Sequence, residues 1–564
     1  MAMREFWENS GMRLLFGDCT FDSDARTLRR GSDDGHLTGK AFQLLELLLH
    51  ARPNPIAKSE LFARLWPDTF VSEANLASLV KEIRDAIGDD ARAPRFVRTV
   101  HRFGYAFSGP VTEVPQRNGI DSIAVLPFAN RSGNPDLDYL AEGVTESLIN
   151  TLSSIEGLRV TPRGSAFRYK DREGDLDAIR RDLDVRAALT GRIRVAGDVV
   201  NLQVEIVDLA KRAQLWGRKF EAPIRGLLAL EEELSREVLT ALRRDDRGSR
   251  KRYTENAAAY QLYLKGRHHW NRRTAEGIER AIFNFESAID ADAAYAPAYS
   301  GLADCWIALG SRDLHPPLQV MPKAEAAARR ALALDADLAE AHASMGAIHE
   351  VFHWNWDAAQ QEYLTALRIN PAYVTVRQWY ALALAHRGRF DEALAQISVA
   401  LDADPLSFLL NANVAVIHYL RRAYDAADES CLRAIEINPH HEPARFTLGL
   451  AHQQRGRIEE ARAELEKALS ISRGEPHVIA ALGALDRSRE RLEALAEISV
   501  TRDVSPVHFA TIHAALDERD RAFEWLERAV EARSGWLVYL ATEPRFDSLR
   551  DDPRFREIVR RILQ

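Results

Sequence analysis

Short polar and basic side chains recur along one predicted helix, residues 72–88, and along the predicted β-hairpin that follows it. Lys81 and Arg84 carry cationic groups that can contact DNA phosphates or donate two hydrogen bonds to guanine. Asn75 and Ser78 are short donors and acceptors that suit base edges or the DNA backbone. Arg102, at the predicted hairpin tip, suits a narrow minor groove. The candidate contacts to double-stranded DNA are Ser72, Asn75, Ser78, Lys81, Arg84, Arg98, Thr99 and Arg102.

Two carboxylates on the same helix make it less basic. Glu82 and Asp85 would repel phosphate unless they point away or accept a hydrogen bond from cytosine. A run of charges by itself is more often a solvated surface. The order of helices followed by a hairpin favours DNA binding over that simpler interpretation.

One motif is typical of an enzyme. His349, Glu350 and His353 spell HExxH, in which two histidines one helical turn apart hold zinc and the glutamate acts as a base. The segment nevertheless falls in a repeated helical unit, where His349 occupies a packing position shared with later units. Neither a GxxxxGK[ST] loop nor a GxSxG turn occurs in the sequence. We therefore expect no catalytic residue, no bound metal and no cofactor.

The elements that position the DNA candidates are predicted from the first 110 residues. Strand-like segments come first, and LTGKAFQLLELLLH, KSELFARLW and SEANLASLVKEIRDAIG then predict three helices, the third capped by Ser72 and ended by Gly88. FVRTVHRFGYAFSG alternates apolar and polar residues and predicts a β-hairpin. On the third helix the residues expected to face the core at helical spacing are Leu76, Leu79, Val80, Ile83 and Ile87.

Residues 12–109 resemble the winged-helix DNA-binding domain of the OmpR/PhoB type in the stretches just quoted and in PNPIAKSELFARLWPD. The resemblance implies that the third helix enters the major groove and that the hairpin reaches the neighbouring minor groove or its phosphates. Our hypothesis is that an event on the repeats or the middle domain shifts DNA affinity, self-association or contact with RNA polymerase, the last through the loop Trp66 to Phe70. Because about ten residues precede the first predicted strand and no long apolar run follows the winged helix, we expect neither phosphorelay input nor the membrane helix of CadC-like relatives.

The middle of the chain alternates strands with helices and predicts an α/β domain over residues 121–243. SIAVLPF and GLRVTP are typical of buried strands around a helix, and IRVAGDVVNLQVEIVDL predicts a hairpin that turns at Ala196, Gly197 and Asp198. VLPF, EGVTESL and LWGRKF resemble the TolB-like domain that accompanies repeat arrays in bacterial regulators. That resemblance implies no biochemical activity. Polar segments at 111–120 and 244–256 are predicted linkers.

The C-terminal part repeats. An alanine before a short apolar and acidic segment recurs every 34 residues at Ala366, Ala400, Ala434 and Ala468. Small residues mark where two helices of a unit touch, glycines mark the turn and prolines end the second helix. The pattern resembles the tetratricopeptide repeat and extends over residues 257–564, as an all-helical solenoid with a C-terminal cap.

The repeat register predicts a concave face that binds a protein or peptide partner. The first helix of each unit lines this face, and a groove of aliphatic and aromatic groups suits a helix with apolar anchors. Ordinary contact between units explains the same residues equally well. The candidates are Gln378, Leu382, Val416, Tyr419, Phe446 and Leu450.

Composition limits the class of protein and the compartment in which it acts. The 564 residues are 46% hydrophobic and 28% charged with a net charge of −8, which fits a folded, multidomain chain whose basic surface is local. Three scattered cysteines and the lack of a long apolar run predict a cytoplasmic protein without contact to a membrane. We interpret the sequence as a one-component, sequence-specific transcriptional regulator, able to form a homodimer. The alternative is a scaffold whose winged helix binds protein.

Overall fold

The computed structural model describes residues 12–23, 27–31, 33–34, 37–65, 73–113, 120–155, 157–244 and 251–563. The chain forms two compact units, residues 1–119 and 120–564. Ser72 and the loop Trp66 to Phe70, predicted to contact DNA and RNA polymerase, lie outside the described residues. No helix in the described ranges is long and apolar enough to cross a membrane.

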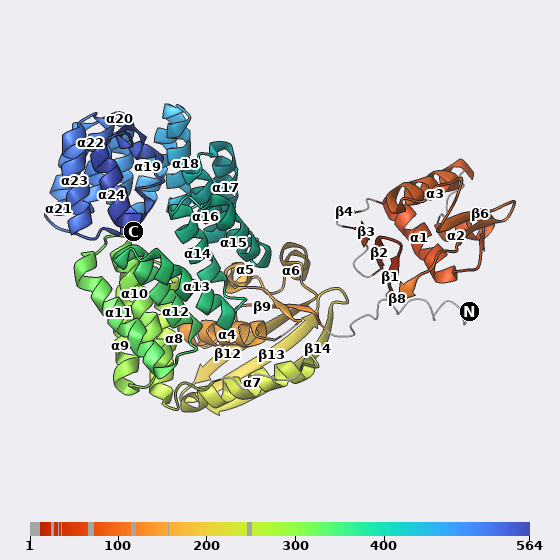
Figure 1. Cartoon of the computed structure of the whole chain (residues 1–564). Coiled ribbons are helices and arrows are strands. Elements are labelled where there is room, and N and C mark those ends of the chain that lie inside the picture. Colours follow the sequence, from red (N-terminus) through yellow and green to blue (C-terminus); the bar gives the residue numbers. More distant parts are fainter. Residues whose placement is uncertain are drawn as a thin grey trace. The chain divides into compact units, whose positions relative to one another are not determined.

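The first unit begins with an antiparallel sheet in the order β4-β3-β2-β1-β8 (Figure 1). Cys19 and Phe21 on β2 and Leu28 on β3 face the core, so alternate residues of these strands are buried. β8 falls inside the predicted linker 111–120, so the folded unit extends further than expected. The strands are β1 (Arg13–Phe16), β2 (Cys19–Asp22), β3 (Thr27–Arg30), β4 (Asp33–Asp34) and β8 (Thr112–Glu113).

Three helices and a second sheet follow, in the order that the sequence predicts. Thr38 accepts a hydrogen bond from the Ala41 amide and caps the first helix, and that helix buries a continuous leucine stripe against the third. The second sheet has the order β5-β7-β6, and β6 and β7 form the predicted hairpin. The elements are α1 (Gly39–Ala51), β5 (Ile56–Ala57), α2 (Lys58–Leu65), α3 (Glu73–Ile87), β6 (Val97–Val100) and β7 (Gly104–Phe107).

The second unit starts with a mixed sheet in the order β11-β9-β12-β13-β14, with β10 paired to β12. β9, β11 and β12 are parallel, whereas β12, β13 and β14 are antiparallel. The predicted hairpin is confirmed, because Gly197 turns between β12 and β13 with a φ of +61°. The strands are β9 (Ser122–Val125), β10 (Ala129–Asn130), β11 (Arg159–Val160), β12 (Ala187–Ala196), β13 (Val199–Asp208) and β14 (Ala213–Pro223).

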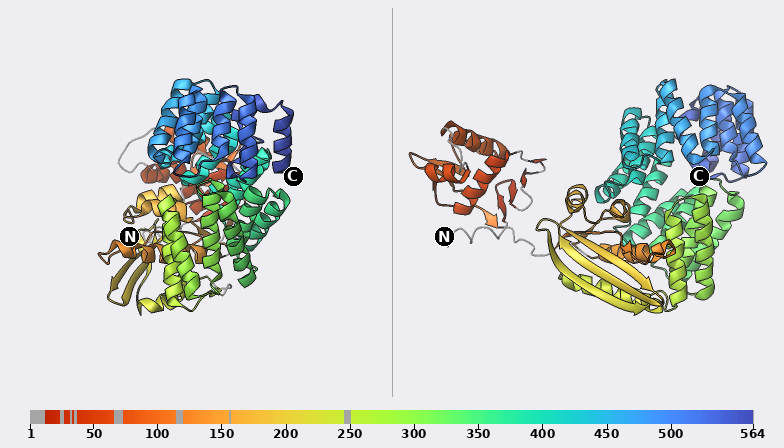
Figure 2. Two further views of the ribbon diagram at one scale, coloured as in Figure 1. Left: turned by 90° about the vertical axis from the view of Figure 1, so that its left-hand side faces the viewer. Right: turned by 180° about the vertical axis from the view of Figure 1, so that it is seen from behind.

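Helices α4 and α7 cover one face of this sheet, and α6 packs against the other face only near β9 and the start of β12. The right-hand view of Figure 2 shows the three long strands from the side opposite α7. Leu202, Val204 and Ile206 of β13 share one core with α4 and α7. Ala124 and Ala188 share a smaller core with α6. The helices are α4 (Asp138–Ser153), α5 (Arg163–Ala166), α6 (Leu176–Leu183) and α7 (Leu227–Ala241).

Helix pairs then form the repeat array, coloured from green to blue in Figure 1. A Cβ on Gly346 would lie 2.7 Å from the Tyr363 ring, and one on Gly449 would lie 2.7 Å from Leu465, so small residues do mark close helix contacts. The helices are α8 (Ala257–Asn271), α9 (Ala275–Ala291), α10 (Ala296–Ser311), α11 (Pro317–Leu334), α12 (Ala339–Ile348), α13 (Trp356–Ile369), α14 (Val374–His386), α15 (Phe390–Ala403), α16 (Phe408–Leu420), α17 (Tyr424–Ile437), α18 (Glu442–Gln454), α19 (Ile458–Ser472), α20 (Pro476–Asp486), α21 (Arg489–Ser499), α22 (Pro506–Ala515) and α23 (Arg519–Glu531).

The C-terminal segment turns back onto the array. The 3₁₀ helices η5 (Gly535–Tyr539) and η6 (Pro544–Leu549) and helix α24 (Pro553–Leu563) follow α23. The Trp356 indole N–H donates to the Ile562 carbonyl at 2.7 Å, which joins α13 to α24. The predicted linker 244–256 is not free throughout, because Tyr253 donates to Asp335 at 2.8 Å and Thr254 donates to Asp292.

Candidate nucleic-acid interface

Helix α3 has one buried face and one polar face. Leu76, Val80, Ile83 and Ile87 are buried and Leu79 packs beside them, which confirms the predicted apolar stripe. On the other face Asn75, Ser78 and Lys81 are exposed. The helix therefore presents hydrogen-bond donors and a cation to solvent, as recognition of a DNA groove requires.

A hollow of about 590 Å³ lies between α3 and the start of α1. Asn75 and Ser78 line it from α3, and Lys40 and Gln43 line it from α1. Lys40 and Gln43 at the start of α1 therefore extend the polar face of α3. Lys40 and Gln43 were not predicted from the sequence, because only the fold brings the two helices together.

Glu82 does not project freely from α3. Its two carboxylate oxygens accept hydrogen bonds from Thr38, from the backbone amide at 2.5 Å and from the hydroxyl at 3.1 Å. The carboxylate is thus held against the start of α1. Of the two outcomes predicted for Glu82, the structure shows the one in which the carboxylate points away from the polar face. Asp85, by contrast, is exposed.

Arg84 links α3 to the hairpin. Its guanidinium donates to the Val97 carbonyl at 2.7 and 3.2 Å and to the Thr99 hydroxyl at 3.2 Å. The sequence predicts a direct contact of Arg84 with DNA. In the structure the Arg84 side chain instead binds β6 and holds that strand in position. Thr99 is likewise an acceptor for Arg84.

Asp89 anchors the other end of the hairpin. This buried carboxylate accepts hydrogen bonds from the amides of Arg95 at 2.6 Å, Phe96 at 3.2 Å and Val97 at 2.8 Å. Three amides converge on one carboxylate, so the segment before β6 is fixed relative to the end of α3. Asp89 was not among the residues predicted for the site, and its one sequence signal is an acid directly after the helix-ending Gly88.

The tip of the hairpin is open to solvent. Arg98, His101 and Arg102 are exposed, and Phe103 donates its amide to the Val100 carbonyl at 3.0 Å to close the turn. Arg102 has a φ of +60°, which places it at the tightest point of that turn. The wing therefore presents three basic side chains to solvent.

The predicted partner groove of the repeats is not open. Gln378, Tyr419, Phe446 and Leu450 are buried, and Leu382 and Val416 are half-buried in the same core. The prediction of an open face is wrong at Tyr419, which is 2% exposed and donates to Glu543 at 2.5 Å. These residues do lie on the first helices of their repeat units, α14, α16 and α18, but the chain's own C-terminal segment occupies the face that they line.

Glu543 forms a buried ion pair inside that segment. Arg545 donates to it at 3.0 Å, and the Arg545 guanidinium lies 5.8 Å from the centre of the Phe446 ring. Burial alone would raise the pKa of Glu543, but Arg545 and Tyr419 outweigh it and lower the pKa. A charged carboxylate is therefore stable in this closed part of the groove.

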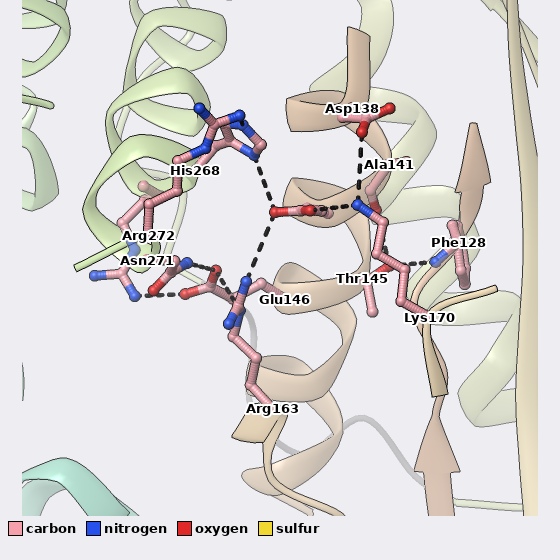
Figure 3. Close-up of polar contacts among 12 residues, drawn as sticks. Phe128, Asp138, Ala141, Thr145, Glu146, Arg163, Lys170, His268, Asn271 and Arg272 are labelled. Atoms are coloured by element: carbon pink, nitrogen blue, oxygen red, sulfur yellow. Dashed lines mark hydrogen bonds and ion pairs between the residues drawn. The ribbon is translucent and has the colours of Figure 1, made fainter. Parts of the chain in front are cut away.

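The first repeat helix is also covered, by α4 of the middle domain (Figure 3). Arg267 on α8 donates to Glu146 at 2.5 Å, and Arg163 lies 3.5 Å from the same carboxylate. Asn271 donates to Glu146 at 3.1 Å. Burial opposes ionisation of Glu146, but the two guanidinium groups lower its pKa. The middle domain and the first repeat thus share one polar network.

Glu142 belongs to the same interface. It accepts from Lys170 at 3.0 Å and contacts His268 at 3.0 Å. Burial raises its pKa, and the bonds to His268 and Lys170 more than reverse this and lower the pKa to about 2. Further along the array, the Ser165 hydroxyl donates to Asp404, so the middle domain contacts the array at two separate places.

The HExxH segment is not arranged as a zinc site. Glu350 is 4% exposed and accepts hydrogen bonds from Tyr363 at 2.7 Å and contacts His386 at 2.8 Å. His353 instead contacts Glu325 at 3.1 Å. The described residues contain no group of three or more potential metal ligands. Glu350 therefore packs inside the array, and the prediction that the motif holds no metal stays a prediction.

Family comparisons assign a class to each part. Residues 32–107 match the family "Transcriptional regulatory protein, C terminal", and residues 119–235 match the second domain of HilA/YgeH-like transcriptional regulators. Residues 419–485 match the tetratricopeptide repeat. The chain therefore carries an OmpR/PhoB-type winged helix, a HilA-like regulator domain and tetratricopeptide repeats. The middle domain's resemblance to TolB stays a prediction.

Curated relatives match over parts of their length. The chain is 36% identical over 129 residues to "Putative adenylate cyclase 3" of Rhizobium meliloti (strain 1021), which covers 23% of this chain and 22% of that protein. It is 36% identical over 89 residues to the transcriptional regulatory protein PcoR of Escherichia coli, covering 16% of this chain and 39% of PcoR. The chain thus spans well under half of either relative.

Solved structures show likeness of fold only. The DNA-binding domain of Klebsiella pneumoniae RstA, in complex with the RstA box, is 20% identical and covers 17% of this chain and 96% of that chain, with a TM-score of 0.16. A human IFIT1 dimer with PPP-AAAA is 15% identical and covers 60% of this chain and 83% of that chain, with a TM-score of 0.40. Neither TM-score supports an argument about function.

Proposed function

We propose that this protein is a one-component transcriptional regulator that binds double-stranded DNA sequence-specifically through α3 and the β6–β7 hairpin. Two features together carry the proposal. Helix α3 exposes a polar face with Asn75, Ser78 and Lys81, and the adjoining wing is held in place by Arg84 and Asp89. Major-groove readout needs such a face, and the wing requires a fixed starting point. The matched regulator families support the same assignment.

In this proposal the exposed residues of the interface have separate roles. Asn75 and Ser78 read base edges, Lys81 contacts phosphate or guanine, and Arg98 and Arg102 reach the neighbouring minor groove or its phosphates. Arg84 and Thr99 act through the position of the hairpin. Ser72 remains a candidate contact on the grounds of the sequence alone.

In this proposal the middle domain and the repeats sense an effector or recruit a protein partner. The protein acts in the cytoplasm, without an enzymatic step or cofactor, and RNA polymerase and a protein or peptide are its further partners. Because the chain itself fills the predicted groove at Tyr419 and Phe446, a partner of the repeats binds on other surfaces. A regulator rather than a scaffold is favoured by the two regulator families matched in sequence.

Selection of genomic fragments by the purified full-length protein tests the proposal. A shared motif among bound fragments is expected, and it should be lost in a Lys81→Ala, Arg102→Ala double variant. A Lys211→Ala variant, in an exposed turn of the second unit, is the matched control. Binding without a shared motif, or equal binding by the double variant, would contradict sequence-specific recognition by this surface.

A further inference from the structure

Strand β14 lies at the end of its sheet. Among the strands that the structure describes it pairs with β13 and with no other. It is 11 residues long, and Phe220 is its only buried residue. Its register with β13 is regular from Trp216 to Pro223, because the one irregularity lies next to Ile206. A long, regular edge strand leaves a row of backbone donors and acceptors that can pair with another strand.

The two faces of β14 differ in their neighbours. On the side of α7, Phe220 is buried in the core and Arg218 forms ion pairs with Glu233 and Glu237. The opposite face carries residues of the other parity, including Lys219 and Glu221, because side chains alternate along a strand. Both are exposed, and neither has an ion-pair partner within the described ranges of the chain.

We propose that β14 pairs antiparallel with β14 of a second copy, in the register centred on Phe220. This register sets Lys219 opposite Glu221 of the second copy, and Glu221 opposite Lys219 of the second copy, so two opposite charges meet twice. The two Phe220 side chains lie opposite each other on the helix-covered side. The sheet then continues through both copies, and each strand edge is satisfied by the other.

Neighbouring registers are less favourable. A pairing centred on Arg218 places that arginine opposite itself, and one centred on Lys219 places two lysines opposite each other. Like charges directly opposite on a sheet are destabilising. Since the charge pattern of β14 fits its own antiparallel copy in the register centred on Phe220, the occupant of the edge is a second copy of this chain.

Pairing of two β14 strands would also affect DNA recognition, and this consequence rests on the proposed function. A two-fold symmetric dimer carries two winged helices, and two winged helices bind two half-sites. Dimer formation itself can be measured without DNA. The failure of the dimer and the failure of DNA binding are therefore distinguishable.

Analytical ultracentrifugation of the full-length protein, with Lys219→Glu, Glu221→Lys and the double exchange, tests the proposal. We expect the wild type to dimerise, and each single variant to weaken the dimer about tenfold or more because like charges meet twice. The double exchange restores opposite charges and should restore the dimer. Lys211→Glu, a charge reversal in the turn before β14, is the matched control and should leave the dimer unchanged.

Every other result overturns the proposal. A wild type that stays monomeric would show that the edge is unpaired, and a dimer insensitive to both single variants would place the contact elsewhere. Weakening in the double exchange as well as in the single variants would exclude the register centred on Phe220. Far-ultraviolet circular dichroism of each variant separates loss of pairing from loss of folding.

Discussion

Two surfaces predicted to bind partners behave differently in this molecule. The polar face of α3 in the first unit is exposed at Asn75, Ser78 and Lys81. The concave face of the repeats is buried at Tyr419 and Phe446 by the chain's own C-terminal segment. Both surfaces follow from a correct register of the helices that carry them.

A repeat motif therefore identifies which residues face the inner side of the array, but it does not identify the segment that packs against them. In the winged helix, polar residues alternate with the core stripe, so their exposure follows from the helix period itself. In the repeats the residues on the inner side are partly apolar, and burying their side chains against any apolar segment is favourable. A segment of the same chain is always present at high effective concentration, so it occupies such a face first.

The largest expected effect comes from breaking the filled groove. Glu543→Ala would leave Arg545 buried without its carboxylate partner, and we expect a loss of about 3–5 kcal/mol in the free energy of unfolding of the second unit. Denaturant unfolding of the full-length protein measures the effect. Glu557→Ala, which removes an exposed partner of Arg560, is the control and should leave the stability nearly unchanged. An equal effect of both variants would mean that the groove is open in solution.

Acid should weaken the contact between the middle domain and the first repeat. The pKa of Glu142 is lowered from 4.5 to about 2, so its contribution is fully present above pH 4.5 and is lost as the pH falls towards 2. A shift of this size corresponds to about 3 kcal/mol at most. We expect Glu142→Gln to destabilise the second unit at pH 7 and to be nearly neutral near pH 2. A difference from wild type that does not shrink below pH 4.5 would contradict this assignment.

Loss of the wing anchor should affect the first unit alone. Asp89→Ala leaves the amides of Arg95, Phe96 and Val97 without their acceptor, and we expect about 1–3 kcal/mol of destabilisation together with weaker DNA binding. Asp90→Ala is the control, because that carboxylate is exposed and accepts a hydrogen bond from the Arg92 amide at 2.8 Å, ahead of the hairpin. Hydrogen exchange of the hairpin amides measures the local effect. Unchanged exchange in the Asp89 variant would show that the wing is held by other contacts.

The smallest effect concerns a single exposed cation. Lys81→Ala should reduce the slope of log binding constant against log salt concentration by about one, because one phosphate contact is lost. The fold should be unaffected, since the side chain is exposed. Fluorescence anisotropy with a selected operator at several salt concentrations measures the slope. A slope identical to that of the Lys211→Ala control would remove Lys81 from the interface.

Arg84 and Glu82 show how far the sequence alone could predict the site. Their place on the polar side of α3 follows from the helix period, but their partners do not. Arg84 donates to Val97 and Thr99, and Glu82 accepts from Thr38, a residue 44 positions earlier in the chain. Such pairings depend on the packing of α3 against α1 and β6, so no local pattern predicts them. Lys40 joined the candidate interface for the same reason.

The order of the parts, and the periodicity within each part, follow from the amino-acid sequence alone. Hydrophobic spacing and turn residues are local properties, so the α3 stripe, the β12–β13 hairpin and the repeat spacing could all be predicted from it. Which polar and apolar faces stay exposed depends instead on how the folded elements pack against one another. Closure of the repeat face by Glu543 and coverage of α8 by Glu146 arise from contacts between residues more than a hundred positions apart, whose burial depends on how the whole chain packs.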